Sequence, residues 1–340
     1  MRQVKVGVIG VGRMGQRHCR VYSTLRQAQL VGVCDAVPEI GRRVAEEYEV
    51  PFYEDVDALL ERVDAVSLTT PTPSHFGLAM RCLDRGVHVL IEKPVTETVK
   101  QAEILARVAE SCPLVAQVGH IERFNPAYIE LKNVLENMTV LAVNFRRLSP
   151  YVGSNTDVDV VLDLMTHDVD LALDLMGREP VSVNAYGLTA FSGYIDHAVT
   201  HLCFGSGPIL TLTASRVTEQ KVRFVEVTAL EAYVEADLLN KSLSVHRRTV
   251  GEYLNHDRRG VKYRQESVVE RIFVPTQEPL FLELQHFVDC ILHGNAPQVS
   301  VRDGLNALRL VTDIRNAIYE SLSVVTEEAR RVRDAICVPV

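Results

Sequence analysis

The chain has 340 residues, enough for two domains, and an ordinary globular composition with 47% hydrophobic and 24% charged residues. Its formal net charge is −8 and its Lys and Arg residues form no cluster, which argues against a nucleic-acid partner. The longest apolar runs have only the length of strands, so no membrane span is expected, and seven cysteines without CxxC spacing predict reduced thiols in a cytoplasmic protein.

Short apolar strands alternate with amphipathic helices over the first part of the chain. The strand candidates are Val4–Ile9, Leu30–Cys34, Ala65–Leu68, Val87–Ile91 and Leu114–Gln117. The helix candidates lie at about Arg13–Gln27, Pro38–Tyr48, Val56–Glu61, Ser74–Arg85 and Thr98–Ser111. Because these strands are apolar throughout, the alternation predicts an α/β Rossmann domain, a doubly wound parallel sheet covered by helices on both faces.

The pattern changes after Gly119. A helix is expected at Asn125–Glu136, then a strand at Val140–Leu148 and a helix at about Asp159–Met176. The later strand candidates are Val181–Leu188, Asp196–Phe204, Ile209–Ser215, Val222–Leu230, Ala232–Asp237 and Val268–Val274, followed by helices at Pro279–Leu292 and Arg302–Ser321. This order predicts an α+β domain with a large, mostly antiparallel open sheet, and we expect the first domain to span residues 1–121 and the second 122–340.

A glycine-rich segment, Gly10-Val11-Gly12-Arg13-Met14-Gly15, joins the first strand to the first helix. A lone GxGxxG motif is weak evidence for a cofactor site. Here, however, it has the context of a dinucleotide-binding fingerprint: a strand before it, a helix after it and Asp35 at the end of the next strand. Gly10 permits the tight turn, Gly12 lets the backbone approach a pyrophosphate, and Gly15 lets helix and strand pack closely. The alternative is a structural glycine turn.

Asp35 bears on the choice of cofactor. Its carboxylate would accept hydrogen bonds from the adenosine ribose and repel a 2′-phosphate, so NAD is expected rather than NADP. Arg42 or Arg43 could still reach a phosphate, which leaves NADP as the alternative.

The segment with Thr70, Pro71 and His75 follows the strand Ala65–Leu68. Loops at the carboxyl ends of parallel strands line the ligand crevice, so these residues are expected to border the cofactor. The segment also reads as a helix start capped by Ser74, and the two readings are compatible.

Two further motifs suggest acid–base chemistry. In Glu92-Lys93-Pro94, a lysine follows a strand and could stabilise negative charge on a substrate oxygen, although taken alone it reads as a surface lysine. Asp163 and His167 are spaced i, i+4 on a predicted helix, so the carboxylate could fix the imidazole as a general base. The alternative is a solvated acidic stripe that continues through Asp170 and Asp174.

Other charged residues give weaker signals. His197 and His201 lie on a predicted strand without a partner that would complete a ligand set, so no metal site is expected. Arg216, with Lys221 and Arg223, could meet an anionic substrate or simply face solvent.

The glycine fingerprint with His18, Thr70-Pro71 with His75, Glu92-Lys93-Pro94 and Asp163-x-x-x-His167 resembles the Gfo/Idh/MocA oxidoreductase family. The resemblance runs over nearly the whole chain, to about Ser321. It implies that His167 is the general base, that Lys93 orients and polarises the reacting oxygen, and that Asp163 positions or tunes the pair. Hydride would pass from a sugar-ring carbon to C4 of the nicotinamide. The family fold further implies a homodimer or homotetramer formed through the sheet of the second domain.

Two segments are similar to a narrower branch, the dehydrogenases that oxidise the 3-hydroxyl of UDP-N-acetylglucosamine. They are Gly119–Pro126 and Val161–Asp170, and the approach Asp159–Leu162 lacks the glycines typical of inositol- and glucose-type members. A nucleotide sugar would need polar and cationic contacts, for which the candidates are His120, Arg123, Asn125, Arg146, Arg147 and Arg216. The alternatives are an inositol, an aldose or a deoxysugar as substrate, or a non-catalytic NAD-binding redox sensor.

Overall fold

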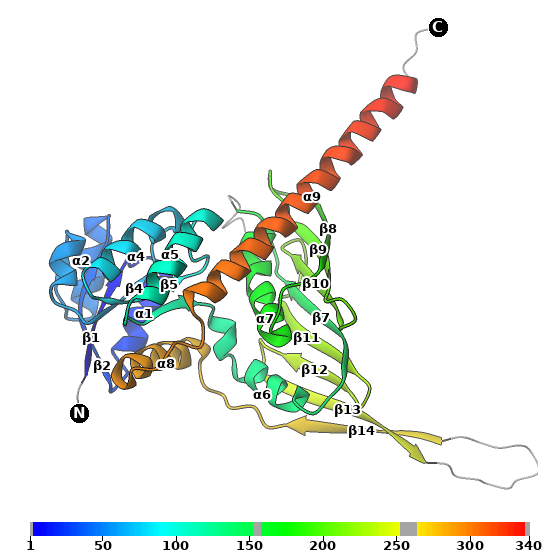
Figure 1. Ribbon diagram of the computed structural model, residues 1–340, viewed down its shortest axis with the longest axis horizontal. Coiled ribbons are helices and arrows are strands. Elements are labelled where there is room, and N and C mark those ends of the chain that lie inside the picture. The colour runs from blue at the N-terminus through cyan, green and yellow to red at the C-terminus, as the bar shows by residue number, and fades with distance from the viewer. Residues whose placement is uncertain (1–2, 152–157, 252–263, 337–340) are drawn as a thin grey trace, which may run out of the picture. The chain divides into compact units, whose positions relative to one another are not determined.

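The computed structural model describes residues 3–151, 158–251 and 264–336, and the chain divides into two compact units (Figure 1). Unit 1 comprises Met1–Phe124 with Gln277–Leu310, and unit 2 comprises Asn125–Thr276 with Val311–Val340. The first division lies close to the expected boundary at residue 121. Residues 277–310 were expected in the second domain but pack in unit 1. The reason is their first helix, Pro279–His293, which places Leu284 and Phe287 in the core beside the sheet of unit 1.

Unit 1 is built on a six-stranded parallel sheet with the order β3-β2-β1-β4-β5-β6. Its strands are β1 (Val4–Ile9), β2 (Ala28–Cys34), β3 (Phe52–Tyr53), β4 (Ala65–Leu68), β5 (His88–Glu92) and β6 (Ala116–Gly119). The Rossmann prediction is confirmed, and only β3, too short to show a period, was not predicted. The chain reverses its direction of progress between β1 and β4, which is where such sheets bind ligands.

Helices cover both faces of this sheet. They are α1 (Arg13–Tyr22), α2 (Pro38–Glu47), α3 (Val56–Leu60), α4 (His75–Asp84), α5 (Val99–Ser111) and α8 (Pro279–His293), with short 3₁₀ turns η1 (Thr72–Ser74) and η2 (Ile121–Phe124). Along β5, Val89 and Ile91 belong to one buried apolar cluster and Leu90 to the other, so the strand is covered on both sides. The first helix ends earlier than predicted, since the Ser23 hydroxyl donates to a carbonyl of its last turn.

Unit 2 holds an eight-stranded sheet with the order β14-β13-β12-β11-β7-β10-β9-β8. Its strands are β7 (Val140–Leu148), β8 (Ser182–Leu188), β9 (His197–Cys203), β10 (Ile209–Ser215), β11 (Val222–Ala229), β12 (Tyr233–Asp237), β13 (Ser242–Gly251) and β14 (Arg264–Ile272). Only β7 and β10 pair in parallel, so the prediction of a mostly antiparallel sheet is confirmed. Strand β13 was not predicted, because its apolar alternation is limited to Leu243 and Val245 before a charged run.

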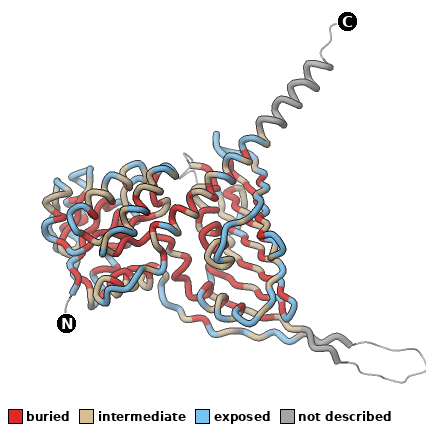
Figure 2. Tube along the Cα trace, viewed as in Figure 1, coloured by how far each residue is buried: buried red, intermediate tan, exposed pale blue. Residues whose placement is uncertain are grey.

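The helices of unit 2 are α6 (Pro126–Leu135), a π-helical turn η3 (Val161–Met165), α7 (Thr166–Met176) and the part of α9 (Val301–Ile336) that begins at Val311. Of these, α6, η3 and α7 contact strands of the sheet and lie on one face of it. Buried Phe145 and Arg147 alternate along β7 with exposed Arg146, the pattern of a strand with one covered face. Buried and more exposed stretches alternate along the strands of this unit (Figure 2). The helix predicted over Asp159–Met176 is present, but it is not a regular α-helix throughout, because residues 161–165 form a π-helical turn that runs directly into α7.

Candidate active site

The glycine loop lies at the carboxyl end of β1. Gly10 has a φ of +85°, and a Cβ added to Gly15 would clash with the carbonyl oxygen of Gly10. A Cβ on Gly12, in contrast, would meet no atom within 4 Å. Turn geometry and packing thus require Gly10 and Gly15, whereas the space over Gly12, at the N-terminus of α1, is open. That is the position which the fingerprint assigns to a pyrophosphate, with Arg13 exposed and Met14 half-buried beside it.

Two alanine substitutions should separate these roles. Gly15→Ala is expected to destabilise unit 1 by about 1–3 kcal/mol, because the added methyl group overlaps backbone atoms. Gly12→Ala should leave the melting temperature of the cofactor-free protein unchanged, since its φ of −65° suits alanine, yet weaken NADH binding by about tenfold or more. Thermal melting followed by circular dichroism and NADH fluorescence titration measure the two effects. Equal losses of stability in both variants would contradict the distinction.

Asp35 follows β2 and is half-buried. One carboxylate oxygen accepts the Val11 N–H at 2.7 Å and the other accepts the Val37 N–H at 2.8 Å. The side chain thereby ties the glycine loop to the turn after β2. A carboxylate oxygen can accept more than one hydrogen bond, so Asp35 keeps acceptor capacity for ribose hydroxyls.

His75 braces two loops at the same edge of the sheet. Its Nδ1 lies 2.9 Å from the Pro94 carbonyl oxygen and its Nε2 lies 2.8 Å from the Thr70 carbonyl oxygen. The ring is 1% exposed, whereas Thr70 is half-buried and Pro71 is exposed. His75, predicted to border the cofactor, therefore supports the loops that carry Thr70 and Lys93 from beneath.

Glu92 and Lys93 stand where β5 ends, and the Lys93–Pro94 peptide bond is cis. The buried Glu92 carboxylate has one oxygen 3.1 Å from Nε2 of His18, and its other oxygen accepts the Lys93 N–H at 3.2 Å. His18 is fully buried on α1. Strands β1, β4 and β5 are in register at Ile9, Leu68 and Ile91. The residues that follow them, which include the glycine loop, Thr70 and Lys93, therefore share one edge of the sheet.

In unit 2, Asp163 lies within the π turn and His167 lies in the first turn of α7. Both side chains are half-buried. The i, i+4 prediction assumed a regular α-helix, and the wider turn changes the angle between the two residues about the helix axis.

Two ion pairs hold this segment at its ends, the first of them buried and the second half-buried on its arginine side. Arg147 Nε lies 3.0 Å from each carboxylate oxygen of Asp168, and its Nη2 donates to one of them at 2.7 Å. At the other end, the Asp159 carboxylate accepts the N–H groups of the first π-helical residues and Arg315 Nε at 2.7 Å. Sequence reasoning missed both carboxylates as site-forming groups, although Asp168 directly follows His167. Arg147, named as a substrate candidate, is 1% exposed and takes part in this frame instead.

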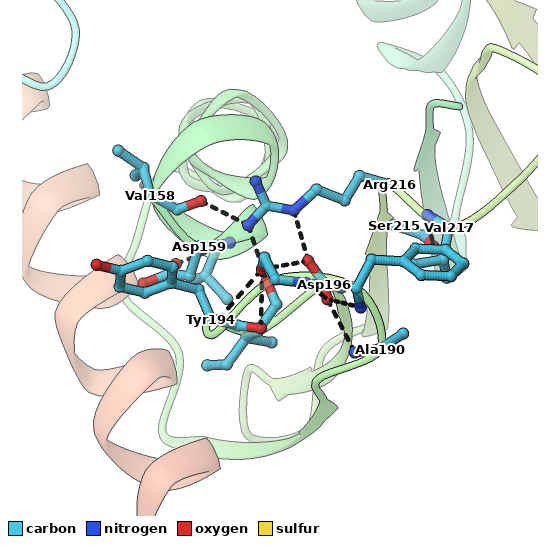
Figure 3. Close-up of polar contacts among 12 residues, drawn as sticks. Val158, Asp159, Ala190, Tyr194, Asp196, Ser215, Arg216 and Val217 are labelled. Atoms are coloured by element: carbon cyan, nitrogen blue, oxygen red, sulfur yellow. Dashed lines mark hydrogen bonds and ion pairs between the residues drawn. The ribbon is translucent and has the colours of Figure 1, made fainter. Parts of the chain in front are cut away.

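Arg216, also expected to meet an anionic substrate, is committed to a buried network (Figure 3). Its Nε lies 2.9 Å from Asp196, and its guanidinium donates to the carbonyl oxygens of Val158 and Ile195. Although burial raises the pKa of Asp196, hydrogen bonds from Ser192 and neighbouring backbone N–H groups hold that pKa far below its usual range. The expectation that Arg216 contacts a substrate is not supported, because its charge is neutralised within the fold.

The other substrate candidates belong to both units. His120 directly precedes η2 and Arg123 lies within it, and both are buried in unit 1. Asn125 caps α6, since its oxygen accepts the Ala127 N–H at 3.1 Å and its amide donates to the Leu238 carbonyl at 2.9 Å. Arg146 lies on the exposed face of the sheet, 3.7 Å from Glu226, and so on the face opposite to α7.

The described residues contain no group of three or more His, Cys, Asp and Glu side chains arranged to hold a metal ion. His201 lies on β9 with its Nδ1 3.1 Å from the Thr211 hydroxyl, and burial lowers the pKa of His197. In the same part of the chain, no helix is both long and apolar enough to cross a membrane.

The fold and the loops at the strand ends define an oxidoreductase with a dinucleotide-binding domain. The chain belongs to the Gfo/Idh/MocA family: residues 4–120 match the model of the oxidoreductase family with NAD-binding Rossmann fold, and residues 144–235 match that of the GFO/IDH/MocA C-terminal domain. It is thus an NAD(P)-dependent dehydrogenase acting on CH–OH groups, as predicted.

Similar proteins include dehydrogenases of two substrate types. A UDP-N-acetylglucosamine 3-dehydrogenase from Acidithiobacillus ferrooxidans is 38% identical over 251 residues, covering 74% of this chain and 79% of that protein. Its solved structure aligns with a TM-score of 0.85 at 32% identity, covering 94% of this chain and 98% of the other. A scyllo-inositol 2-dehydrogenase (NAD(+)) from Bacillus subtilis is 25% identical over 339 residues, which cover 95% of this chain and 96% of that protein.

Proposed function

We propose that this dehydrogenase oxidises the 3-hydroxyl of a UDP-N-acetylamino sugar to a ketone, with NAD as the hydride acceptor. The observation that carries the proposal is the 38% identity to a UDP-N-acetylglucosamine 3-dehydrogenase, over a stretch that covers 74% of the chain. The presence of Lys93, Asp163 and His167 supports a catalytic protein over a redox sensor, since cofactor binding alone would need none of the three.

The proposed mechanism assigns one step to each side chain. His167 takes the proton of the sugar hydroxyl as its carbon loses a hydride, and the Asp163 carboxylate favours the imidazolium that results. The Lys93 ammonium stabilises the negative charge that develops on the substrate oxygen. Bound NAD supplies the nicotinamide ring that accepts the hydride. The open surface over Gly12 and the Asp35 carboxylate fit its pyrophosphate and ribose.

Asp35 is expected to set the preference for NAD over NADP. Asp35→Ser should raise the ratio of kcat/KM for NADP to that for NAD by about tenfold or more, because a carboxylate repels the 2′-phosphate. Asp35→Asn is the matched second variant: it removes the charge but keeps an oxygen that can accept the Val11 N–H, so the ratio should rise in it as well. Steady-state rates with both cofactors give the ratio. An unchanged ratio in both variants would exclude Asp35 as the determinant.

The substrate proposal is tested by NADH formation at 340 nm with UDP-sugars, free sugars and inositols. Turnover with UDP-N-acetylglucosamine but not with inositols is the expected result. Turnover only with inositols would favour the second candidate, which rests on the similarity to scyllo- and myo-inositol 2-dehydrogenases at 25% and 27% identity. A single-turnover measurement with stoichiometric enzyme covers the case in which NADH stays bound between turnovers.

We also propose that the protein is a homodimer or homotetramer that assembles through the sheet of unit 2. The face opposite to α6 and α7 carries exposed apolar side chains, among them Tyr186 (63% exposed) on β8, Ile209 (55%) on β10 and Tyr233 (36%) on β12. Burying such a face against a second copy would remove apolar area from water. The mass in solution, measured by light scattering, tests the proposal.

The free thiols of the described cysteines fit a cytoplasmic location, which we propose as well.

A further inference from the structure

The π turn that carries Asp163 is completed by a side chain. In a regular α-helix the Thr166 N–H would donate to the carbonyl of Leu162. Here it donates to the carbonyl of Val161 instead, and the Thr166 hydroxyl donates to Leu162 at 2.8 Å and lies 3.1 Å from the Val161 oxygen. Thr166 is 2% exposed, so water cannot easily replace the hydroxyl.

The chain on both sides of the turn is fixed. The buried Asp159 carboxylate accepts the N–H groups of Val161 and Leu162 at 3.0 and 2.9 Å, which anchors the start of the turn. Past the turn, Asp168 is bound by the buried Arg147. Because both ends are anchored, a change in the geometry of the turn would act mainly on the residues between them, which include Asp163 and His167.

We propose that the Thr166 hydroxyl is a positioning group that keeps the turn π-helical and thereby sets the placement of Asp163 relative to His167. The inference rests on the proposed acid–base function of that pair. Without the hydroxyl, the half-buried Leu162 carbonyl loses a donor, and relaxation toward a regular α turn restores one from the backbone. That relaxation rotates Asp163 about the helix axis with respect to His167. Thr166 itself touches neither substrate nor cofactor in this role.

The test compares Thr166→Val, which removes the hydroxyl at nearly constant shape, with Thr166→Ser, which keeps it. Thr166→Val should lower kcat by about 10–100-fold, in line with the effect of a small misplacement of a catalytic group. KM for the sugar and the Kd for NADH should stay within about threefold, and Thr166→Ser should restore kcat to within about threefold of wild type. A purely stabilising role would lower the melting temperature without this separation of kcat from KM.

Three results would overturn the proposal: wild-type kcat in Thr166→Val, an equal loss of kcat in Thr166→Ser, or a loss confined to NADH affinity. If Thr166→Val does not fold, Thr166→Ala replaces it, because alanine removes the hydroxyl without placing a methyl group against the Val161 and Leu162 carbonyls. A second readout needs no substrate: the ring signals of His167 in ¹H–¹⁵N spectra, assigned with His167→Asn. They should move in Thr166→Val and stay in place in Thr166→Ser. Unmoved signals would overturn the positioning role, whichever substrate the enzyme takes.

Discussion

His167→Asn is expected to lower kcat for sugar oxidation by about 10²–10⁴-fold, the usual contribution of a general base. Asparagine has a similar polar outline but cannot accept the proton of the hydroxyl. The affinity for NADH should stay within about threefold of wild type, because the glycine loop and Asp35 belong to unit 1 and His167 belongs to unit 2. Absorbance at 340 nm gives kcat with the substrate that the sugar panel identifies, and fluorescence titration gives the affinity for NADH.

His293→Asn is the matched control, since His293 is exposed at the end of α8 and its Nδ1 lies only 2.8 Å from a backbone carbonyl of its own helix. This control should keep wild-type kcat. If His167→Asn also kept it, the base would have to be another group, and Lys93 would be the next to replace. A wild-type protein that binds NADH but oxidises none of the offered alcohols would instead favour the sensor hypothesis.

Local patterns were sufficient for most of unit 1. The strand Val4–Ile9, the glycine loop and Asp35 lie close together in sequence. The strand was predicted from its apolar run, and the loop and Asp35 were predicted from the spacing of the dinucleotide-binding fingerprint. The same holds for Glu92-Lys93-Pro94, which follows a strand. The sequence predicted where these residues lie along the sheet edge. It did not show that His75 is a buried brace, because its partners Thr70 and Pro94 come from two different loops.

Contacts distant in sequence explain the remaining differences. Residues 277–310 return to unit 1, and no local signal distinguishes the apolar face of α8 from a helix of the second domain. Arg216 looked available for a substrate because its partner Asp196 lies in a different loop, just before β9. Arg146 and Arg147 are adjacent in sequence, yet strand alternation sends the first to the exposed face and the second to the buried one. The π turn could not be predicted, because its ends are anchored by Arg147 and Arg315, which lie elsewhere in the chain.

The buried pair Arg147–Asp168 should have the largest effect on stability. Arg147→Leu is expected to lower the free energy of unfolding of unit 2 by about 3–5 kcal/mol, because it leaves the Asp168 carboxylate charged in a site that is 3% exposed. The measurement is urea unfolding followed by circular dichroism at two protein concentrations, so that any dissociation of subunits is recognised. NADH affinity, determined by unit 1, serves as a check that the rest of the molecule is intact.

Arg247→Leu is the control in the same unit. Arg247 Nε lies 2.9 Å from Glu270, but the two side chains are 41% and 42% exposed, so its removal should cost at most about 1 kcal/mol. The double variant Arg147→Leu/Asp168→Leu distinguishes two causes of the large loss. If the penalty comes from the carboxylate left without its arginine, the double variant is more stable than Arg147→Leu alone. If it comes from lost packing, the loss in Arg147→Leu and the loss in the single variant Asp168→Leu add up in the double variant. The pair would then not be the electrostatic anchor of the segment that carries Asp163 and His167.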